Sequence, residues 1–97
     1  MAKSTHETKT FEKLQEQVER YSGLKLEAYP QDDGHLRKNE WDANAYAVLS
    51  GQEAAIVDLV RAIESNGFTV RNAVKVFDMM RYWFMAHNSK AYMTLLD

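Results

Sequence analysis

The apolar positions of the chain recur every three or four residues over most of its length, which is the period of an amphipathic helix. The first such segment carries a narrow apolar stripe made by Phe11, Leu14, Val18 and Tyr21. Ser22 and Gly23 follow it, and a glycine directly after a helical segment is typical of a left-handed C-terminal stop. The pattern predicts an N-terminal helix that starts near Thr8 or Thr10 and ends at this glycine.

The period changes to two in the segment 24–38, where Leu24, Leu26 and Ala28 alternate with Lys25, Glu27 and Tyr29. Pro30 ends the alternation, and residues 31–34 have the Gln-Asp-Asp-Gly composition of a turn. Leu36 would then face back across that turn. The pattern therefore favours a short two-stranded β-hairpin at about 24–38, and a structured loop is the alternative.

Residues 40–49 return to helical spacing, with Asn39 in the position of an N-cap. Their apolar positions fall on one side of a helix and comprise Trp41, Ala45, Val48 and Leu49. The spacing predicts a short helix that buries Trp41 against the rest of the protein.

The most strongly patterned helix follows directly. Ser50 and Glu53 have the spacing of a capping box. One face of the next residues is apolar through Ile56, Leu59, Val60 and Ile63, whereas the other carries Asp58, Arg61, Glu64 and Ser65. Asn66 and Gly67 end this face, and Phe68 stands where a Schellman motif places its closing apolar contact. We expect a helix over about 51–66.

A longer helix is predicted over about 70–87, with Thr69 as its N-cap. Phe77 and Phe84 lie near the centre of its apolar arc. The first half of the helix is amphipathic, but the second half is apolar all round because Met79, Tyr82 and Ala86 replace polar residues there. A helix that is apolar on every side is normally covered on every side. Two elements could cover this part of the helix: the C-terminal segment 89–97, folded back as a short helix over Met79 and Tyr82, or another chain.

These elements predict a mostly α, compact small helical domain. Its centre is an antiparallel helical hairpin of about 51–66 and 70–87, with the short β-hairpin at about 24–38. The polar stretch 1–9 is expected to be a flexible lead-in, and residues 10–97 a single globular domain.

Composition narrows the classes of function. The net charge is −2, which gives no overall attraction to nucleic acid or to anionic lipid. No run of about 18 apolar residues is present, so no membrane association is expected. The chain contains no cysteine, which excludes disulfides and thiolate chemistry and fits a cytoplasmic location.

Few residues suggest chemistry. Asp32, Asp33 and His35 share one turn, but three ligands without a recognised spacing are weak grounds for a metal site. His87 falls in the last turn of its predicted helix, where the helix dipole favours an imidazolium, so its presence there needs no functional explanation. No nucleophile elbow or phosphate loop occurs. We therefore expect no enzyme activity, catalytic residue, metal, cofactor or small-molecule substrate.

The function that remains is a small non-enzymatic protein–protein interaction or regulatory protein. It would bind another protein, or itself as a homodimer, through an apolar surface of Met79, Tyr82, Trp83, Arg81 and Tyr92. Arg81 has two interpretations: its stem packs on Phe77 or Phe84 while its head reaches a carboxylate or solvent, or it is an interface arginine.

The alternative is a helix-turn-helix regulator. Residues 56–77 read as helix, glycine-containing turn and helix, and Thr69, Arg71, Asn72 and Lys75 at the start of the second helix are of types that contact bases and phosphates. Ile63 and Asn66 do not suit the tight motif, and the charge is unfavourable. DNA binding is therefore the disfavoured alternative.

Overall fold

The computed structural model describes residues 5–96 as four helices and one two-stranded antiparallel sheet. The helices are α1 (Thr5–Ser22), α2 (Gly51–Ser65), α3 (Ala73–His87) and α4 (Ser89–Leu95), and the strands are β1 (His35–Lys38) and β2 (Tyr46–Leu49). The expectation of a small, mostly α fold is confirmed.

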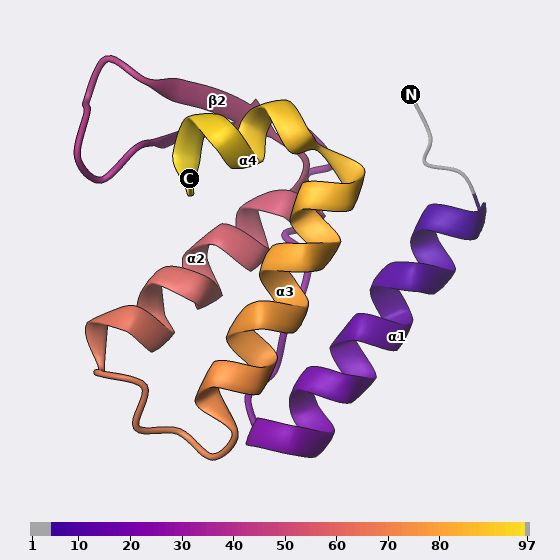
Figure 1. Ribbon diagram of the computed structural model, residues 1–97. Coiled ribbons are helices and arrows are strands. Elements are labelled where there is room, and N and C mark those ends of the chain that lie inside the picture. The colour runs from indigo at the N-terminus through magenta and orange to yellow at the C-terminus, as the bar shows by residue number, and fades with distance from the viewer. Residues whose placement is uncertain (1–4, 97) are drawn as a thin grey trace.

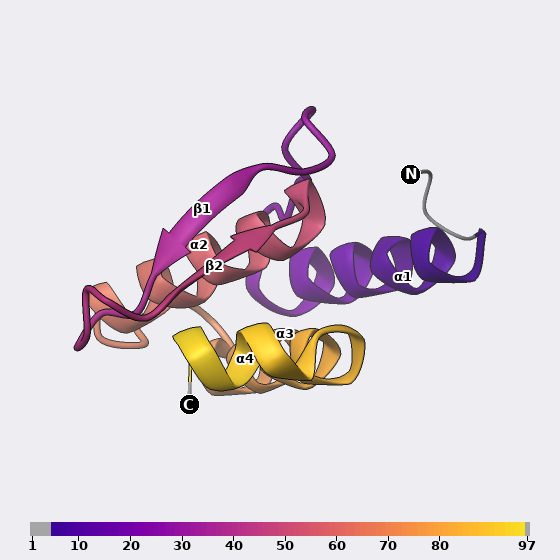
Figure 2. The ribbon, with the colours of Figure 1, turned by 90° about the horizontal axis from the view of Figure 1, so that it is seen from above.

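Helix α3 lies between α2 and α1, as Figure 1 shows, and packs against both of them and against α4. Helices α1 and α3 run antiparallel, because Thr10 approaches His87 at one end and Tyr21 meets Asn72 at the other. The β-ribbon lies along α2 on the side away from α3, and α4 runs beside β2 (Figure 2). Helix α2 is therefore covered by α3 on one side and by the ribbon on the other.

One apolar core joins these elements. Its fully buried side chains come from α1, β2, α2 and α3 and include Val18, Leu49, Ile56, Ile63, Met80 and Phe84. Helix α3 contributes residues at helical spacing, namely Ala73, Val76, Met80 and Phe84. Phe77, expected at the centre with Phe84, is only half-buried and packs edge-to-face on Phe68, with ring centroids 5.0 Å apart.

The helix ends follow the local signals. Ser50 and Glu53 form the reciprocal hydrogen bonds of a capping box at the start of α2. The amide of Phe68 donates to the Ile63 carbonyl at 3.0 Å, and Gly67 has a φ of 73°, which together complete the Schellman motif. Gly23, with a φ of 79°, ends α1 by donating to the Glu19 carbonyl at 2.8 Å.

The hairpin predicted within 24–38 is wrong in its first strand. Residues 24–34 form no strand, and β1 pairs instead with β2, with Leu36 opposite Val48. The extended segment uses its backbone elsewhere: the Tyr29 amide donates to Gly51 O at 3.2 Å, and the Gly51 amide donates to Asp32 O at 3.0 Å. A Cβ at Gly51 would lie 2.5 Å from Tyr29 O, so only glycine permits this approach.

The short helix predicted over 40–49 is also wrong. Its second half is β2, and its first half is a turn in which the Asn39 side chain accepts from the amides of Trp41 and Asp42 at 2.7 and 3.2 Å. Trp41 is 91% exposed rather than buried. Asx turns of this kind offer the backbone a partner that competes with helix formation.

Two helix starts differ from the prediction. Helix α1 begins at Thr5, earlier than Thr8 or Thr10, and residues 1–4 of the expected lead-in lie outside the described residues. Helix α3 begins at Ala73 rather than at residue 70, and its N-cap is Asn72, not Thr69. Asn72 has a φ of 54° and its side chain makes no capping bond, because that side chain is used in a contact with α1.

Candidate interaction surfaces

The C-terminal helix α4 packs on a different side of α3 from the one expected. Its Tyr92 is buried, and the Tyr92 hydroxyl accepts a hydrogen bond from Arg81 Nη2 at 2.5 Å. Arg81 also lies 3.6 Å from Asp78 and 5.3 Å from the centre of the Phe77 ring. The head of Arg81 therefore reaches a carboxylate and a hydroxyl of its own chain, and its guanidinium carbon lies over the Phe77 ring.

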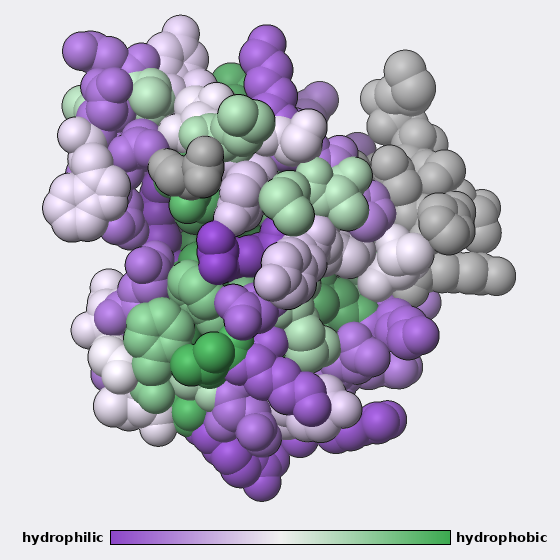
Figure 3. Space-filling model, viewed as in Figure 1, coloured by the Kyte–Doolittle hydropathy of each residue, from purple (hydrophilic) through white to green (hydrophobic). Residues whose placement is uncertain are grey.

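Helix α1, rather than α4, flanks the side of Met79 and Tyr82. A groove of about 470 Å³ runs between the two helices. It is lined by Thr10, Lys13, Leu14 and Gln17 of α1 and by Met79, Tyr82, Trp83, Ala86 and His87 of α3. We name it the α1–α3 groove. Figure 3 shows apolar side chains between α3 and α1 on the face of the molecule that it displays.

Trp83 is held firmly in the lining of the α1–α3 groove. Its ring meets Phe11 edge-on at 5.4 Å and stacks on His87 at 3.9 Å. His87 Nδ1 in turn donates to the Trp83 carbonyl at 2.8 Å. The buried indole Nε1 of Trp83 has no hydrogen-bond partner within the described part of the chain. Tyr82 beside it is 63% exposed, so the groove has a fixed wall and an open aromatic rim.

Three of the four residues considered for DNA binding converge on the end of α1. Arg71 Nε and Asn72 Nδ2 both donate to the Tyr21 carbonyl, at 3.0 and 2.8 Å, and Lys75 Nζ lies 3.8 Å from the centre of the Tyr21 ring. Carbonyls in the last turn of a helix have no partner within the helix. Arg71 and Asn72 therefore cap α1 from the α2–α3 connection, whereas Lys75 contacts the Tyr21 ring from α3. The fourth, Thr69, lies in that connection, and its amide is 3.4 Å from Asn66 Oδ1.

A second apolar surface was missed by the sequence reasoning. The outward side of the β-ribbon and its tip carry four large side chains, Leu36, Tyr46, Val48 and Trp41, which are 50%, 59%, 62% and 91% exposed. We name them the ribbon surface. The signal that predicts it is the alternation from Ala45 to Leu49, in which every second side chain turns inward, but these residues also fit a helical period.

The turn that carries Trp41 is fixed to two helices. Asn39 Nδ2 donates to the Thr94 carbonyl of α4 at 2.9 Å, and Arg61 of α2 lies 3.4 Å from the Glu40 carboxylate. Trp41 is thus presented to solvent from an anchored turn.

The outward carbonyls on the free edge of β1 accept hydrogen bonds from arginine side chains. Asn39 donates to Ala45 O, so the alternate residues Leu36 and Lys38 direct their backbone groups away from β2. Both outward carbonyls are already occupied: Leu36 O accepts from Arg37 Nη1 at 2.9 Å, and Lys38 O accepts from Arg61 Nη2 at 2.6 Å. Covered edges of this kind resist pairing with another chain.

A polar cluster joins the ribbon to α2. Arg37 donates to both oxygens of Asp58 at 2.8 Å, and the Tyr29 hydroxyl donates to Asp58 Oδ2 at 2.5 Å. The hydrogen bond to Asp58 raises the pKa of Tyr29 and that of Arg37. Partial burial acts to raise the pKa of Asp58, but the hydrogen bonds from Arg37 and Tyr29 outweigh it and hold that pKa below its ordinary value. The ionised Asp58 carboxylate therefore has a structural role, because it joins Tyr29 and strand β1 to α2.

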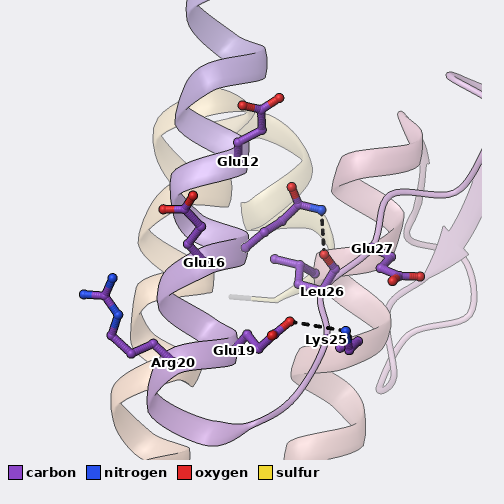
Figure 4. Close-up of a pocket in the computed structure, with 8 residues that line it drawn as sticks. Glu12, Glu16, Glu19, Arg20, Lys25, Leu26 and Glu27 are labelled. Atoms are coloured by element: carbon purple, nitrogen blue, oxygen red, sulfur yellow. Dashed lines mark hydrogen bonds and ion pairs between the residues drawn. The ribbon is translucent and has the colours of Figure 1, made fainter.

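An acidic groove of about 720 Å³ lies on another face of α1, between that helix and residues 25–27 (Figure 4). It is lined by Glu12, Gln15, Glu16, Glu19, Arg20, Lys25, Leu26 and Glu27. Gln15 Nε2 donates to the Leu26 carbonyl at 2.7 Å, and Lys25 Nζ lies 3.6 Å from Glu19, so part of the groove is bridged by its own side chains.

Among residues 10–96, whose side chains the structure describes, no three His, Asp or Glu side chains gather closely enough to hold a metal ion. His35, the imidazole of the Asp32–Asp33 turn, directs Nε2 to the Gln31 carbonyl at 2.6 Å and stacks on Tyr29. None of the helices described is both long and apolar enough to cross a bilayer. The chain matches no protein-family model, no curated protein and no solved structure.

Proposed function

We propose that the chain is a non-enzymatic protein-interaction or regulatory domain that binds another protein, or a second copy of itself, through the α1–α3 groove. The observation that supports this proposal is the position of Tyr82, which remains 63% exposed at the rim of an apolar groove with Met79 and Trp83 in its lining. Tyrosine, tryptophan and methionine are enriched at protein interfaces, and the two aromatic residues bury much apolar area at low entropic cost.

The proposed surface is narrower than the set expected from the sequence. Arg81 and Tyr92 bond each other in the contact between α3 and α4, where their side chains already stabilise the fold. We therefore assign partner binding to Met79, Tyr82 and Trp83. The cytoplasmic location expected from the sequence stays a prediction.

Self-association is the first form of the proposal to test, since a two-fold contact brings one apolar patch onto itself. Sedimentation equilibrium over the micromolar range should show a dimer that Tyr82→Glu dissociates. Tyr46→Glu is the matched control, because Tyr46 is 59% exposed on the ribbon surface. A wild-type mass that stays at the monomer value throughout that range rejects the homodimer and leaves a foreign protein as partner.

For a foreign partner, the test is a complex reconstituted from two purified proteins. Tyr82→Glu should weaken it about tenfold or more, whereas Tyr46→Glu should leave it unchanged. A reconstituted complex that survives Tyr82→Glu but is lost with Tyr46→Glu would move the binding site to the ribbon surface and reject the groove.

DNA binding stays the weaker alternative, because Arg71, Asn72 and Lys75 are engaged with the end of α1. We expect no duplex binding tighter than the nonspecific level of about 10⁻⁴ to 10⁻⁶ M near physiological salt. A sequence-specific complex in a mobility-shift assay that Arg71→Ala or Asn72→Ala abolishes would favour the alternative.

A further inference from the structure

The α1–α3 groove has an electrostatic character opposite to that of the whole chain. The chain has 14 acidic and 12 basic residues, yet none of the residues that the structure describes in the lining of this groove carries a carboxylate. Its lining includes Lys13, which is exposed and forms no ion pair with the rest of the described residues. A second exposed lysine, Lys75, lies over the Tyr21 ring where α1 and α3 meet at their other end. Positive charge therefore flanks the apolar groove.

The other groove on α1 supplies the contrast. Glu12, Glu16, Glu19 and Glu27 line it, against Arg20 and Lys25, and Lys25 is already paired with Glu19 (Figure 4). A ligand that carries acidic groups would be repelled from that groove and attracted to the α1–α3 groove. Helix α1 thus separates two surfaces that select opposite charges.

The shape of the α1–α3 groove suits a helix. Its walls are two antiparallel helices, and its lining on α1 runs from Thr10 to Gln17. Eight residues of helix rise by about 12 Å, which is roughly two turns of a third helix laid in the groove. Leu14, Met79 and Trp83 would receive apolar side chains spaced at i, i+3 or i+4, and i+7 on that helix.

From this combination we infer that the α1–α3 groove binds an amphipathic helix of a partner protein whose apolar stripe is flanked by aspartate and glutamate. The inference rests on the proposed function and adds the chemistry of the partner. The acidic side chains of that helix face Lys13 in the groove and Lys75 where α1 and α3 meet at their other end.

The test is a selection on the purified protein from a displayed library of amphipathic helices. Each helix is of about 15 residues, with a fixed apolar stripe and random flanking positions. Selected sequences should be enriched in Asp and Glu over Lys and Arg at the flanks. Binding of the best synthetic peptide is then measured by fluorescence anisotropy against wild type, Tyr82→Glu, Lys13→Glu and Lys38→Glu. Lys38→Glu is the matched charge control, because Lys38 is exposed on the β-ribbon.

The expected result is a loss of about tenfold or more with Tyr82→Glu, a severalfold loss with Lys13→Glu that shrinks at high salt, and no change with Lys38→Glu. Selected peptides that lose binding with Tyr82→Glu but have neutral or basic flanks would overturn the acidic partner and leave the groove as the binding site. Peptides that bind regardless of Tyr82→Glu, or a selection that returns no binder, would overturn the groove itself.

Discussion

Arg37 and Asp58 form a two-pronged ion pair, in which Nε and Nη2 of the guanidinium each donate to one carboxylate oxygen at 2.8 Å. Arg37 belongs to β1 and Asp58 to the face of α2 that the sequence assigned to solvent. A planar guanidinium fits a carboxylate in this geometry better than a lysine would. The pair explains how a ribbon of two short strands, marginal alone, is held on α2.

The first prediction is a pH dependence of stability. Because the pKa of Asp58 is lower in the folded than in the unfolded chain, its contribution is complete above the unfolded value of about 3.9 and is lost as pH falls through the folded value. Asp58→Asn should lower the free energy of unfolding by about 1–2 kcal/mol at pH 7, a range reduced because the pair is partly exposed. Urea unfolding at pH 7 and pH 3 should show a smaller acid loss in Asp58→Asn than in wild type.

The control for this prediction is Glu19→Gln, since Glu19 pairs with Lys25 at 3.6 Å and both side chains are more than half exposed. It should change stability by less than about 0.5 kcal/mol. Equal acid sensitivity in wild type and Asp58→Asn would show that Asp58 does not govern the acid response. On the alkaline side, the raised pKa of Tyr29 predicts stability that is present below about pH 10 and lost as pH rises through its folded pKa.

The second prediction compares two glycines. Gly51→Ala should cost about 3 kcal/mol or more, because the new methyl group would meet the backbone oxygens of Tyr29 and Gln31 at 2.5 and 2.7 Å. Gly23→Ala has open space, so it should cost only about 1 kcal/mol, from its positive φ. Thermal or urea unfolding of both variants measures the difference. If the two costs were equal, the close approach of residues 29–31 to α2 would be absent in solution.

The third prediction concerns the cap on α1. Asn72→Ala removes the hydrogen bond to the Tyr21 carbonyl and places alanine at a φ of 54°, so it should cost about 2 kcal/mol. Asn72→Gly removes the same bond without the backbone penalty and should cost about 1 kcal/mol. Hydrogen exchange should quicken at the C-terminal end of α1 in both variants. Unchanged exchange there would mean that the α2–α3 connection does not cap α1.

The fourth prediction separates the two tryptophans. Trp83→Phe keeps the ring packing against Phe11 and removes an indole N–H that lacks a partner, so its stability should stay within about 1 kcal/mol of wild type. Trp83→Ala should cost about 3 kcal/mol or more. In Trp83→Phe the remaining fluorescence comes from Trp41, which is 91% exposed, and acrylamide should quench it strongly. A weakly quenched Trp41 would show that the ribbon surface is covered in solution.

The sequence by itself determined the helices whose ends carry their own signals. The capping box of Ser50 and Glu53, the Schellman motif at Gly67 and the stop at Gly23 act over a few residues, so they can be identified without knowledge of the fold. The sequence also showed that Tyr82 and Trp83 belong to a helix segment that is apolar on every side and must therefore pack against another element. The covering element was not identified, because the sequence analysis considered only the C-terminal segment and another chain, whereas α1 flanks this side of α3.

Tertiary contacts decided the secondary structure of residues 24–49 and the residue at which α3 begins. The apolar pattern of residues 45–49 fits a helix and a strand equally well. These residues form strand β2 because β1 and α4 pack beside them. The sequence pattern placed the start of α3 after Thr69, but the helix begins after Asn72, whose side chain donates to the Tyr21 carbonyl, fifty-one positions earlier in the chain. Arg37 and Asp58 are 21 positions apart and meet only once the ribbon lies on α2. Local signals act through neighbouring backbone groups, whereas these contacts exist only after distant segments have packed.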